Sequence, residues 1–489
     1  MSYTSAPLLI SAPGKVILFG EHAVVHGKVN ACNHTCVRGS RLNYHAQSAT
    51  FSMSLSVRGI KLQRLSSFSI QTAIAASLGL RSYLFLQARD DEIIQLTLPD
   101  VGLDKTWSAS TLPGPLPYVP EDPKSKRING DRCCSNISWT FGRNPFCGPT
   151  NSYLDGIHPL ELPSTTKSTL ETMINLPSGS QTAGEQAALA FLYLYLCLYR
   201  TTAPAGLTIC VRSMVPVSAG LGSSASYSVC IATALLIHFG HISPSIVHDA
   251  AEGKHTETIN TWAYKAEQVL HGNPSGIDNA VSTFGGAKLY VKGQGFTTLS
   301  GFSSLRFLLT NTKVPRSTKL LVAGVGDKKS SYPSIMDPIL DAIQGVSDEC
   351  KDVFQAHEQK LVDRKALLEK IQDLIDLNHW LLGAIGVSHP SLEKVREVTA
   401  QFGLRTKLTG AGGGGCAVTL IRDDVDPDTV AKAITILNSF GFDCFETSVG
   451  GPGIGVTSVG AGTSSLVTAE GMRWATREEL EAVSGWRFF

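Results

Sequence analysis

The sequence predicts an α+β protein of two domains. Short runs of β-branched residues are mixed with long Ala- and Leu-rich runs, and several strand-like runs are placed to pair as antiparallel hairpins, which favours this class. The chain has 489 residues, more than one hydrophobic core usually organises. We therefore expect an N-terminal and a C-terminal domain, each with helices and strands.

The elements are expected in the following order. Strands are predicted at 7–28, 72–86, 207–211, 287–291, 305–312 and 442–449, and a strand, a glycine turn and a second strand at 404–420. Helices are predicted at 180–198, 227–237, 247–270, 338–355 and 365–385, and a short one near 476–483. The strand predictions rest on short β-branched runs, whereas the helix predictions rest on runs too long for a typical strand.

Composition restricts the possible functions. The chain carries 42 basic and 41 acidic residues, so its charge favours neither a nucleic-acid nor a membrane partner. No apolar run is long enough to span a bilayer, and residues 1–10 lack the pattern of a secretory signal. The 11 cysteines include no CxxC pair, which favours free thiols in a reducing compartment. We therefore expect a cytoplasmic protein.

A Gly- and Ser-rich turn at 216–226 (PVSAGLGSSAS) joins a predicted strand to a predicted helix. Its glycines let the backbone approach a ligand, and free N–H groups at the start of a helix attract an anion. The turn is not a Walker loop, because no Gly-Lys-Ser/Thr follows it. We expect it to bind phosphate.

Three further motifs accompany this turn: APGKVILFGEHAVVHG at 12–27, HGNPSGIDN at 271–279 and KLTGAGGGGC at 407–416. Glu267 precedes Asp278 by eleven residues. Taken together and in this order, the four motifs resemble the signature set of the GHMP kinases. Their detailed wording is similar to that of the mevalonate kinases within this superfamily.

The resemblance implies a two-domain fold with an N-terminal α/β domain, a ferredoxin-like α+β C-terminal domain and an active site in the cleft between them. It places the N-terminal ATP-binding domain at 1–300, the C-terminal domain at 301–456 and an atypical tail at 457–489. The implied reaction is ATP-dependent phosphorylation of the 5-hydroxyl of mevalonate, and the implied assembly is a homodimer.

The resemblance also assigns residues to the phosphates and the metal ion. The implied ATP- and phosphate-binding residues are Pro216, Ser218, Ala219, Gly220, Leu221, Gly222, Ser223, Ser224, Ala225, Ser226, Gly410, Ala411 and Gly412. Ser224 and Glu267 are the expected ligands of Mg²⁺, since hard oxygen donors suit this ion and it usually takes only one or two from protein.

Asp278 is the implied acid–base group for the substrate hydroxyl. A helix cap is the alternative for an aspartate in such a turn. Lys15 lies in an apolar strand, where a lysine either extends its ammonium to water or pairs with an acid. The resemblance pairs it with Asp278, and a nearby cation would favour the ionised carboxylate and stabilise charge in the transition state.

Glu21, His22 and Thr312 are the expected substrate-side residues. The resemblance implies that Glu21 and His22 contact mevalonate, with His22 directed at its carboxylate or hydroxyls; a surface salt bridge is the alternative. Thr312 lies in a further stretch similar to the mevalonate kinases and is expected to support Asp278.

Two other readings of the function stay open. Another GHMP kinase, such as phosphomevalonate kinase or galactokinase, would share these loops. From a different class, the chain could be a catalytically impaired homologue that only binds nucleotide. The matched catalytic positions are intact, whereas the segment 29–71 departs from the family pattern.

The segment 29–71 contains 43 residues, with eight Ser, five Lys or Arg and no Asp or Glu. Without it, Lys28 joins Thr72 in the continuous sequence expected of the family. The segment begins with Val29, and every Val codon begins with GT. It ends with Gln71, and one Gln codon is CAG. GT and AG are the two ends of a spliced intron. We interpret 29–71 as a retained-intron-like insertion, with a genuine surface loop as the alternative. The stretch 113–159, rich in Pro, Gly, Asn and Cys, is a second anomaly.

We predict that a variant joining Lys28 directly to Thr72 gains soluble yield and specific activity over the full chain. Loop length alone costs little entropy, but the segment can disturb strand register and has no core of its own. Expressing both forms and comparing soluble yield and mevalonate-dependent ATP consumption checks this. Equal behaviour would identify 29–71 as a tolerated loop.

Overall fold

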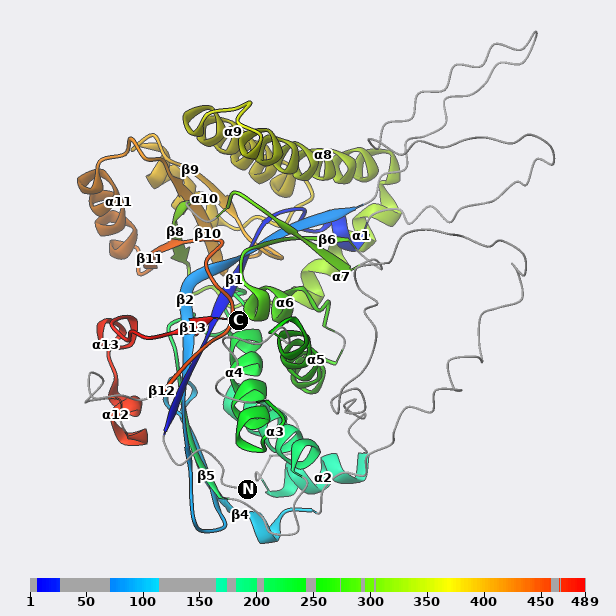
Figure 1. Ribbon diagram of the computed structural model, residues 1–489. Helices are drawn as coiled ribbons and strands as arrows, with labels where there is room; N and C mark the ends of the chain where they lie inside the picture. Colours follow the sequence, from blue (N-terminus) through cyan, green and yellow to red (C-terminus); the bar gives the residue numbers. More distant parts are fainter. Residues whose placement is uncertain are drawn as a thin grey trace, which may run out of the picture. The chain divides into compact units, whose positions relative to one another are not determined.

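The computed structural model describes residues 7–26, 71–113, 164–173, 182–199, 206–242, 252–272, 274–291, 295–302, 305–458, 466 and 468–488 (Figure 1). Apart from Gln71 and Pro113, the two anomalous segments 29–71 and 113–159 lie outside these described residues.

The chain forms two compact units. The first takes residues 1–15, 77–286 and 450–489, and the second takes residues 16–76 and 287–449. Each unit is therefore built from stretches that are separate in the sequence. The reason is that β1 (Leu8–Phe19) and β2 (Thr72–Ala88) each continue from one unit into the other.

The first unit contains a sheet with the strand order β13-β12-β1-β2-β5-β3-β4. Its other strands are β3 (Ile93–Leu98), β4 (Leu103–Ser108), β5 (Leu207–Ser213), β12 (Gly455–Ser458) and β13 (Arg487–Phe488). β3 runs parallel to β5, with Leu96 opposite Ile209. The pairs β2–β5, β3–β4, β1–β12 and β12–β13 are antiparallel.

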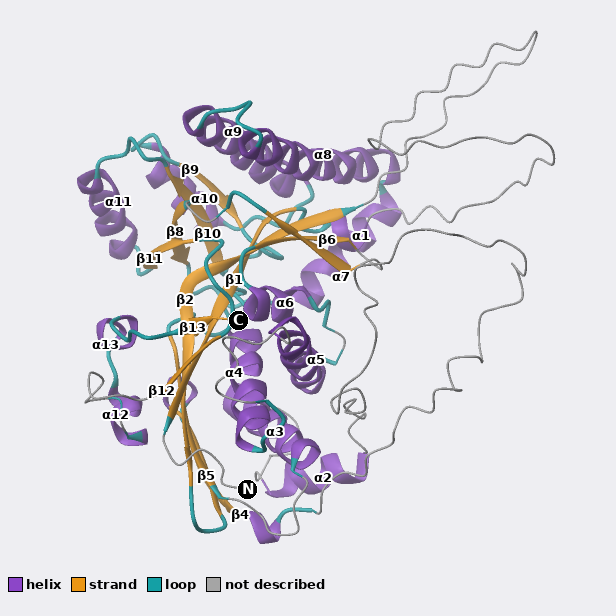
Figure 2. Ribbon diagram, viewed as in Figure 1, coloured by secondary structure: helices purple, strands orange, loops and turns teal. Residues whose placement is uncertain are grey.

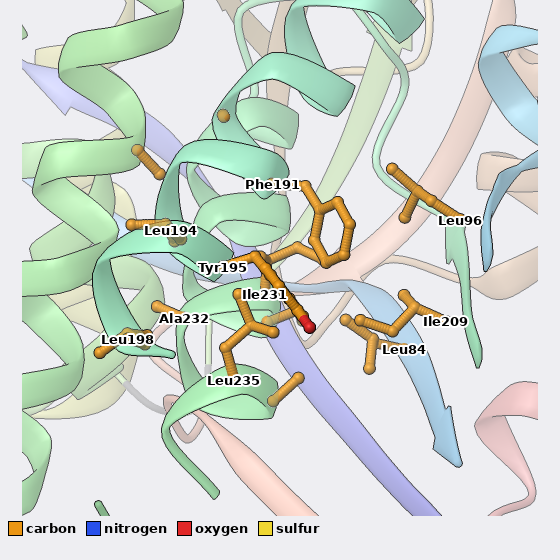
Figure 3. Close-up of a cluster of buried hydrophobic side chains, with 14 of the residues drawn as sticks. Leu84, Leu96, Phe191, Leu194, Tyr195, Leu198, Ile209, Ile231, Ala232 and Leu235 are labelled. Atoms are coloured by element: carbon orange, nitrogen blue, oxygen red, sulfur yellow. The ribbon is translucent and has the colours of Figure 1, made fainter. Parts of the chain in front are cut away.

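Helices of the first unit pack on one face of this sheet. They are α2 (Ser164–Met173), α3 (Ala183–Leu198), α4 (Ser223–His238), α5 (Glu252–His271) and α6 (Ile277–Phe284), with short 3₁₀ turns at Pro99–Val101 and Ala109–Thr111. Figure 3 shows Leu84 and Ile209 of the sheet beside Phe191 of α3 and Ile231 of α4, all fully buried. This apolar contact fixes the helix that follows the Gly- and Ser-rich turn.

The C-terminal tail packs on strand residues that point the other way. Because side chains alternate along a strand, Phe85 and Cys210 follow Leu84 and Ile209 in sequence but belong to a different cluster. That cluster includes Met472 of α12 (Ala469–Trp474) and Leu480 of α13 (Arg477–Glu481). The prediction of a short helix near 476–483 is confirmed.

The second unit contains a four-stranded antiparallel sheet in the order β11-β8-β10-β9. Its strands are β8 (Arg306–Asn311), β9 (Arg405–Leu408), β10 (Cys416–Ile421) and β11 (Asp443–Ser448). A hairpin of β6 (Ala287–Val291) and β7 (Gly295–Leu299) pairs through β6 with Thr72–Ala76 of β2.

The helices of the second unit are α1 (Ala23–His26), α7 (Thr318–Ser331), α8 (Pro333–Glu358), α9 (Arg364–Ala384), α10 (Pro390–Ala400) and α11 (Pro427–Ser439). Helices α9 and α10 contact β9, and α11 contacts β11. The α+β class predicted from the sequence is confirmed (Figure 2). Among the described residues, no helix combines the length and the apolar character needed to cross a bilayer.

The predicted strand at 7–28 ends earlier, at Phe19. Gly20 follows with φ of 88°, and a Cβ there would lie 2.1 Å from the Thr72 carbonyl oxygen, so the chain turns where only glycine fits. The sequence analysis assigned no helix to α6, α7, α10 or α11. In α7 only Val325 is buried, so that segment has no apolar stripe to reveal it.

Candidate active site

In the first unit, the Gly- and Ser-rich segment 216–226 follows β5. Its residues 216–222 form the turn, and its residues 223–226 are already the start of α4, which begins earlier than the predicted residue 227. Gly222 precedes α4 with φ of 75°, and Ser218 and Gly220 also have positive φ. No side chain of the described residues caps the start of α4 at Gly222. Backbone N–H groups at such a helix start, together with the helix dipole, favour an anion.

The predicted phosphate-binding residues of this turn have two different environments. Ser218 and Gly220 are exposed, and Pro216, Ser223 and Ser224 are half-buried. Ala219, Leu221, Gly222, Ala225 and Ser226 are buried. The Ser226 hydroxyl lies 2.7 Å from the Ser82 hydroxyl and donates to the Ser223 carbonyl at 3.0 Å. The Ser226 hydroxyl therefore bonds to other residues of the protein and is not exposed to solvent.

Strand β1 packs directly against this turn. The Lys15 backbone N–H donates to the Leu221 carbonyl at 2.8 Å. A Cβ on Gly14 would lie 2.8 Å from the same oxygen, and one on Gly222 would lie 2.8 Å from Lys15 Cγ. Glycine at both positions therefore lets the lysine-bearing strand and the turn come together.

The structure brings Lys15 and Asp278 together. Lys15 Nζ lies 3.2 Å from Asp278 Oδ1, with the lysine side chain 9% and the aspartate side chain 34% exposed. Asp278 is in the first turn of α6, which follows Gly276 with φ of 82°. The result is an ion pair with a buried cation and a carboxylate that solvent reaches.

Glu267 of α5 is buried beside the start of α4. Its Oε2 accepts from the Ser224 hydroxyl at 3.3 Å and its Oε1 from the Ser228 hydroxyl at 3.0 Å. Burial and, to a smaller extent, the charge of Asp278 raise the pKa of Glu267 to about 7, while the two hydroxyl hydrogen bonds and Lys15 oppose the shift. The carboxylates of Glu267 and Asp278 therefore repel each other. Two hydroxyl oxygens lie beside Glu267.

His271 also reaches this cluster. Its Nε2 lies 3.1 Å from the Ser224 hydroxyl and 3.8 Å from Glu267 Oε2. Burial lowers the pKa of His271 from its ordinary value, and Asp278 opposes this, so the ring is held toward its neutral form. Sequence reasoning named His271 and Ser228 only as parts of longer segments, although His271 lies four residues after Glu267 and so on the same helix face.

In the second unit, Glu21 is enclosed by two partners that sequence reasoning missed. Lys407 Nζ donates to Glu21 Oε1, and Asn378 Nδ2 donates to Oε2 at 3.0 Å. The Glu21 and Lys407 side chains are each 1% exposed. The alternative of a surface salt bridge does not describe this buried pair. Lys407 stands at the start of the late glycine motif, whereas no sequence signal indicated Asn378.

His22 occupies the left-handed region of φ, at 61°. Its Nε2 lies 3.0 Å from the Ala411 carbonyl oxygen, and its Nδ1, which is buried, has no hydrogen-bond partner in the described part of the chain. Burial lowers the pKa of His22, against smaller opposing effects of the Ala411 carbonyl and Glu21. The neutral ring therefore has a second nitrogen ready for a ligand.

Thr312 and the late glycine turn are also in the second unit. The Thr312 hydroxyl donates to the Gly415 carbonyl at 2.8 Å. Arg316 donates to the Gly412 and Gly414 carbonyls, each at 3.2 Å. The predicted residues Gly410, Ala411 and Gly412 lie in this turn, and the two glycines have φ of 70° and 79°. Thr312 therefore holds this turn, and its expected support of Asp278 stays a prediction.

Comparisons with known proteins agree with this assignment of motifs. The model of the GHMP kinases N terminal domain matches residues 188–286, and that of the GHMP kinases C terminal matches residues 363–438. Mevalonate kinase of Mus musculus is 37% identical over 463 residues, covering 94% of this chain and 97% of the relative. The Homo sapiens mevalonate kinase is 36% identical over 460 residues, covering 93% and 96%.

Solved structures show the same fold. The mevalonate kinase of Methanococcus jannaschii matches with a TM-score of 0.55 and 20% identity, covering 91% of this chain and 98% of the other. The mevalonate kinase of L. major in complex with R-mevalonate matches with a TM-score of 0.55 and 19% identity, covering 90% and 94%. With relatives above 30% identity matched along nearly their whole length, the chain belongs to the mevalonate kinase family of the GHMP kinases.

Proposed function

We propose that this chain transfers the terminal phosphoryl group of ATP to the 5-hydroxyl of mevalonate, as a step of isoprenoid and sterol biosynthesis. The observation that carries the proposal is the Lys15–Asp278 ion pair beside the open start of α4. Phosphoryl transfer needs a base for the attacking hydroxyl and positive charge around the phosphates, and both are present within the first unit.

Asp278 acts as the base. Its carboxylate is partly exposed, so a substrate hydroxyl can reach it, and Lys15 keeps it paired with a cation at 3.2 Å. Proton transfer to Asp278 makes the hydroxyl oxygen a better nucleophile as it attacks the phosphorus. The Lys15 ammonium also stabilises negative charge that develops on the transferred group.

The turn at 216–226 and the glycine turn that contains Gly410, Ala411 and Gly412 bind the nucleotide. In the first turn, the N–H groups at the start of α4 and the exposed backbone near Ser218 and Gly220 are suited to phosphate oxygens. Ser226 shapes the turn from within the core.

The residues present fit a Mg²⁺ ion. The charge of Asp278 repels that of Glu267 and raises the Glu267 pKa, and hydroxyls flank the Glu267 carboxylate. A divalent cation would relieve that repulsion, and oxygen donors are its preferred ligands. Glu267 and Ser224 would hold it. When bound, the ion would neutralise charge on the ATP phosphates.

His22 is the proposed contact to mevalonate in the second unit. A carbonyl only accepts hydrogen bonds, so the Nε2 that faces Ala411 carries the hydrogen of the neutral ring. Nδ1 is then an acceptor, which suits a substrate hydroxyl better than its carboxylate. Glu21 and Thr312 act beside it through the backbone they hold, since their polar atoms already have partners.

Three further proposals rest on the family resemblance. The N-terminal ATP-binding domain spans 1–300, the C-terminal domain 301–456 and the tail 457–489. The protein is a homodimer, and it is cytoplasmic.

Replacing Asp278 with Asn should lower kcat by a factor on the order of 10²–10⁴, the usual loss for a general base, while KM for ATP stays nearly unchanged. The physical reason is that the amide cannot take the hydroxyl proton. Steady-state kinetics with mevalonate and ATP measure both constants. The control is Asp104→Asn, which removes an exposed ion pair to Arg473 in the same unit and should leave kcat intact. Near-normal turnover in Asp278→Asn would refute the assigned role.

Replacing Glu267 with Gln should raise the Mg²⁺ concentration needed for half-maximal rate, and part of the lost rate should return at high Mg²⁺. The neutral amide removes one charged oxygen ligand but keeps the shape of the side chain. Because a buried ionised carboxylate is costly, the metal-free variant should unfold at no lower temperature than the parent. An unchanged Mg²⁺ requirement would argue against Glu267 as a ligand.

Gly222→Ala should lower activity more than the matched change Gly240→Ala. Both glycines have positive φ, 75° and 72°, so both variants carry backbone strain of about 1 kcal/mol. Only at Gly222 would the new Cβ meet Lys15 Cγ, at 2.8 Å, since Gly240 has open space. Melting temperatures measure the strain, and kcat measures displacement of Lys15. Equal kcat in the two variants would contradict the packing argument.

A further inference from the structure

A buried polar cluster in the second unit surrounds the Glu21 carboxylate. Lys407 of β9 bonds to one oxygen and Asn378 of α9 to the other, the latter at 3.0 Å. The Glu21 side chain is only 1% exposed, and both of its oxygens accept hydrogen bonds from the fold. Glu21 is thus fixed directly before the residue that is proposed to contact mevalonate.

Lys407 and Glu21 depend on each other. Burial lowers the pKa of Lys407, and the charge and hydrogen bond of Glu21 oppose that shift. Removal of one partner from a buried ion pair leaves an uncompensated charge, which is far more costly than replacing both partners by neutral groups. This difference allows the role of the pair to be separated from its effect on stability.

The chain around Lys407 contacts β1 and the Gly20–His22 turn that follows it at three places, through residues spaced by two positions. Lys407 bonds to the Glu21 side chain. The Thr409 hydroxyl donates to the Ile17 carbonyl at 2.7 Å. The Ala411 carbonyl faces His22 Nε2 at 3.0 Å. One strand end and its following glycine turn thus fix both the carboxylate and the imidazole.

The backbone of the turn needs such support. His22 has φ of 61°, which is unfavourable for a residue with a side chain. Strained backbone of this kind persists only where surrounding contacts determine it, and it is common at ligand sites. The Ala411 carbonyl contacts His22 itself, and Lys407 and Asn378 hold the side chain of the preceding residue, Glu21.

We propose that Lys407 and Asn378 are positioning residues that clamp Glu21 and thereby aim Nδ1 of His22 at a substrate hydroxyl. The inference rests on the proposed role of His22 as a contact to mevalonate. Lys407 and Asn378 do not touch the reacting atoms, so their loss should weaken binding of the hydroxyl substrate, not the chemical step.

The test compares four variants: Lys407→Met, the double variant Glu21→Gln/Lys407→Met, Asn378→Ala and the control Lys288→Met. Lys288 is a buried lysine of the same unit whose ammonium donates to Thr298 in the β6–β7 hairpin at 2.9 Å. Melting temperature, kcat and the KM values for mevalonate and ATP are measured for each.

Lys407→Met alone should melt well below the parent, because it strands the Glu21 charge. The double variant should recover most of that loss in melting temperature. Its KM for mevalonate should stay raised by about 10-fold or more, because the loss of a contact that binds substrate and transition state equally raises KM without lowering kcat. Its kcat and KM for ATP should stay within about twofold of the parent. Asn378→Ala should raise KM for mevalonate in the same direction and to a smaller extent.

A folded double variant with the parental KM for mevalonate would overturn the proposal. So would a lowered kcat with unchanged KM values that matches Lys288→Met, because a smaller folded fraction lowers the apparent kcat and leaves KM unchanged. If Lys407→Met fails to fold, the double variant and Asn378→Ala carry the decision.

A readout independent of activity separates this inference from the proposed function. In protein labelled with ¹⁵N-histidine and assigned with a His22→Gln variant, the His22 shifts should show a hydrogen on Nε2 and a bare Nδ1. The double variant should show a mixture of tautomers, and an unchanged single tautomer would overturn the positioning role. A parent that does not phosphorylate mevalonate would refute the proposed function, while these spectra would still decide the clamp.

Discussion

The contact between Lys15 and the turn before α4 is the constraint on which the first unit's site depends. The backbone N–H of Lys15 bonds to Leu221, and its side chain passes the space where a Cβ of Gly222 would lie. Its ammonium then reaches Asp278 at the start of α6. One residue therefore joins the strand, the start of α4 and Asp278, and the apolar packing of α4 on the sheet keeps that arrangement fixed.

Glu267 and Glu21 are both buried carboxylates, but they differ in whether a neighbouring positive charge compensates them. Glu267 has only hydroxyl donors and repels Asp278, so its environment favours an added cation. Glu21 has a buried ammonium and an amide, so its charge is already compensated. The first arrangement leaves negative charge uncompensated, which fits the metal ion proposed above. The second has no such uncompensated charge, and its effect is to fix a turn.

The fold and the site were predictable to different extents. Strand and helix segments such as β5 and α9 follow from local patterns, because a buried strand or an amphipathic helix repeats its apolar residues at a short period. Helix α10 has the same kind of apolar repeat in Leu392, Val395 and Val398, after a proline in its first turn, although the sequence analysis assigned no helix there. The exposed helix α7 had no such pattern, because a helix that buries a single residue needs no repeating apolar face.

The sequence by itself determined the kinase family and the α+β class, and it singled out Lys15, Glu267 and Asp278, because each lies in or near a motif whose residues are close together in the chain. Tertiary structure alone decided which side chains complete those motifs. Glu21 and Lys407 are 386 positions apart, and Asn378 lies on a helix with no motif of its own. Burial turned Ser226 inward and left Ser218 exposed within one turn. Such outcomes depend on which surfaces the folded chain brings into contact, and no local pattern records them.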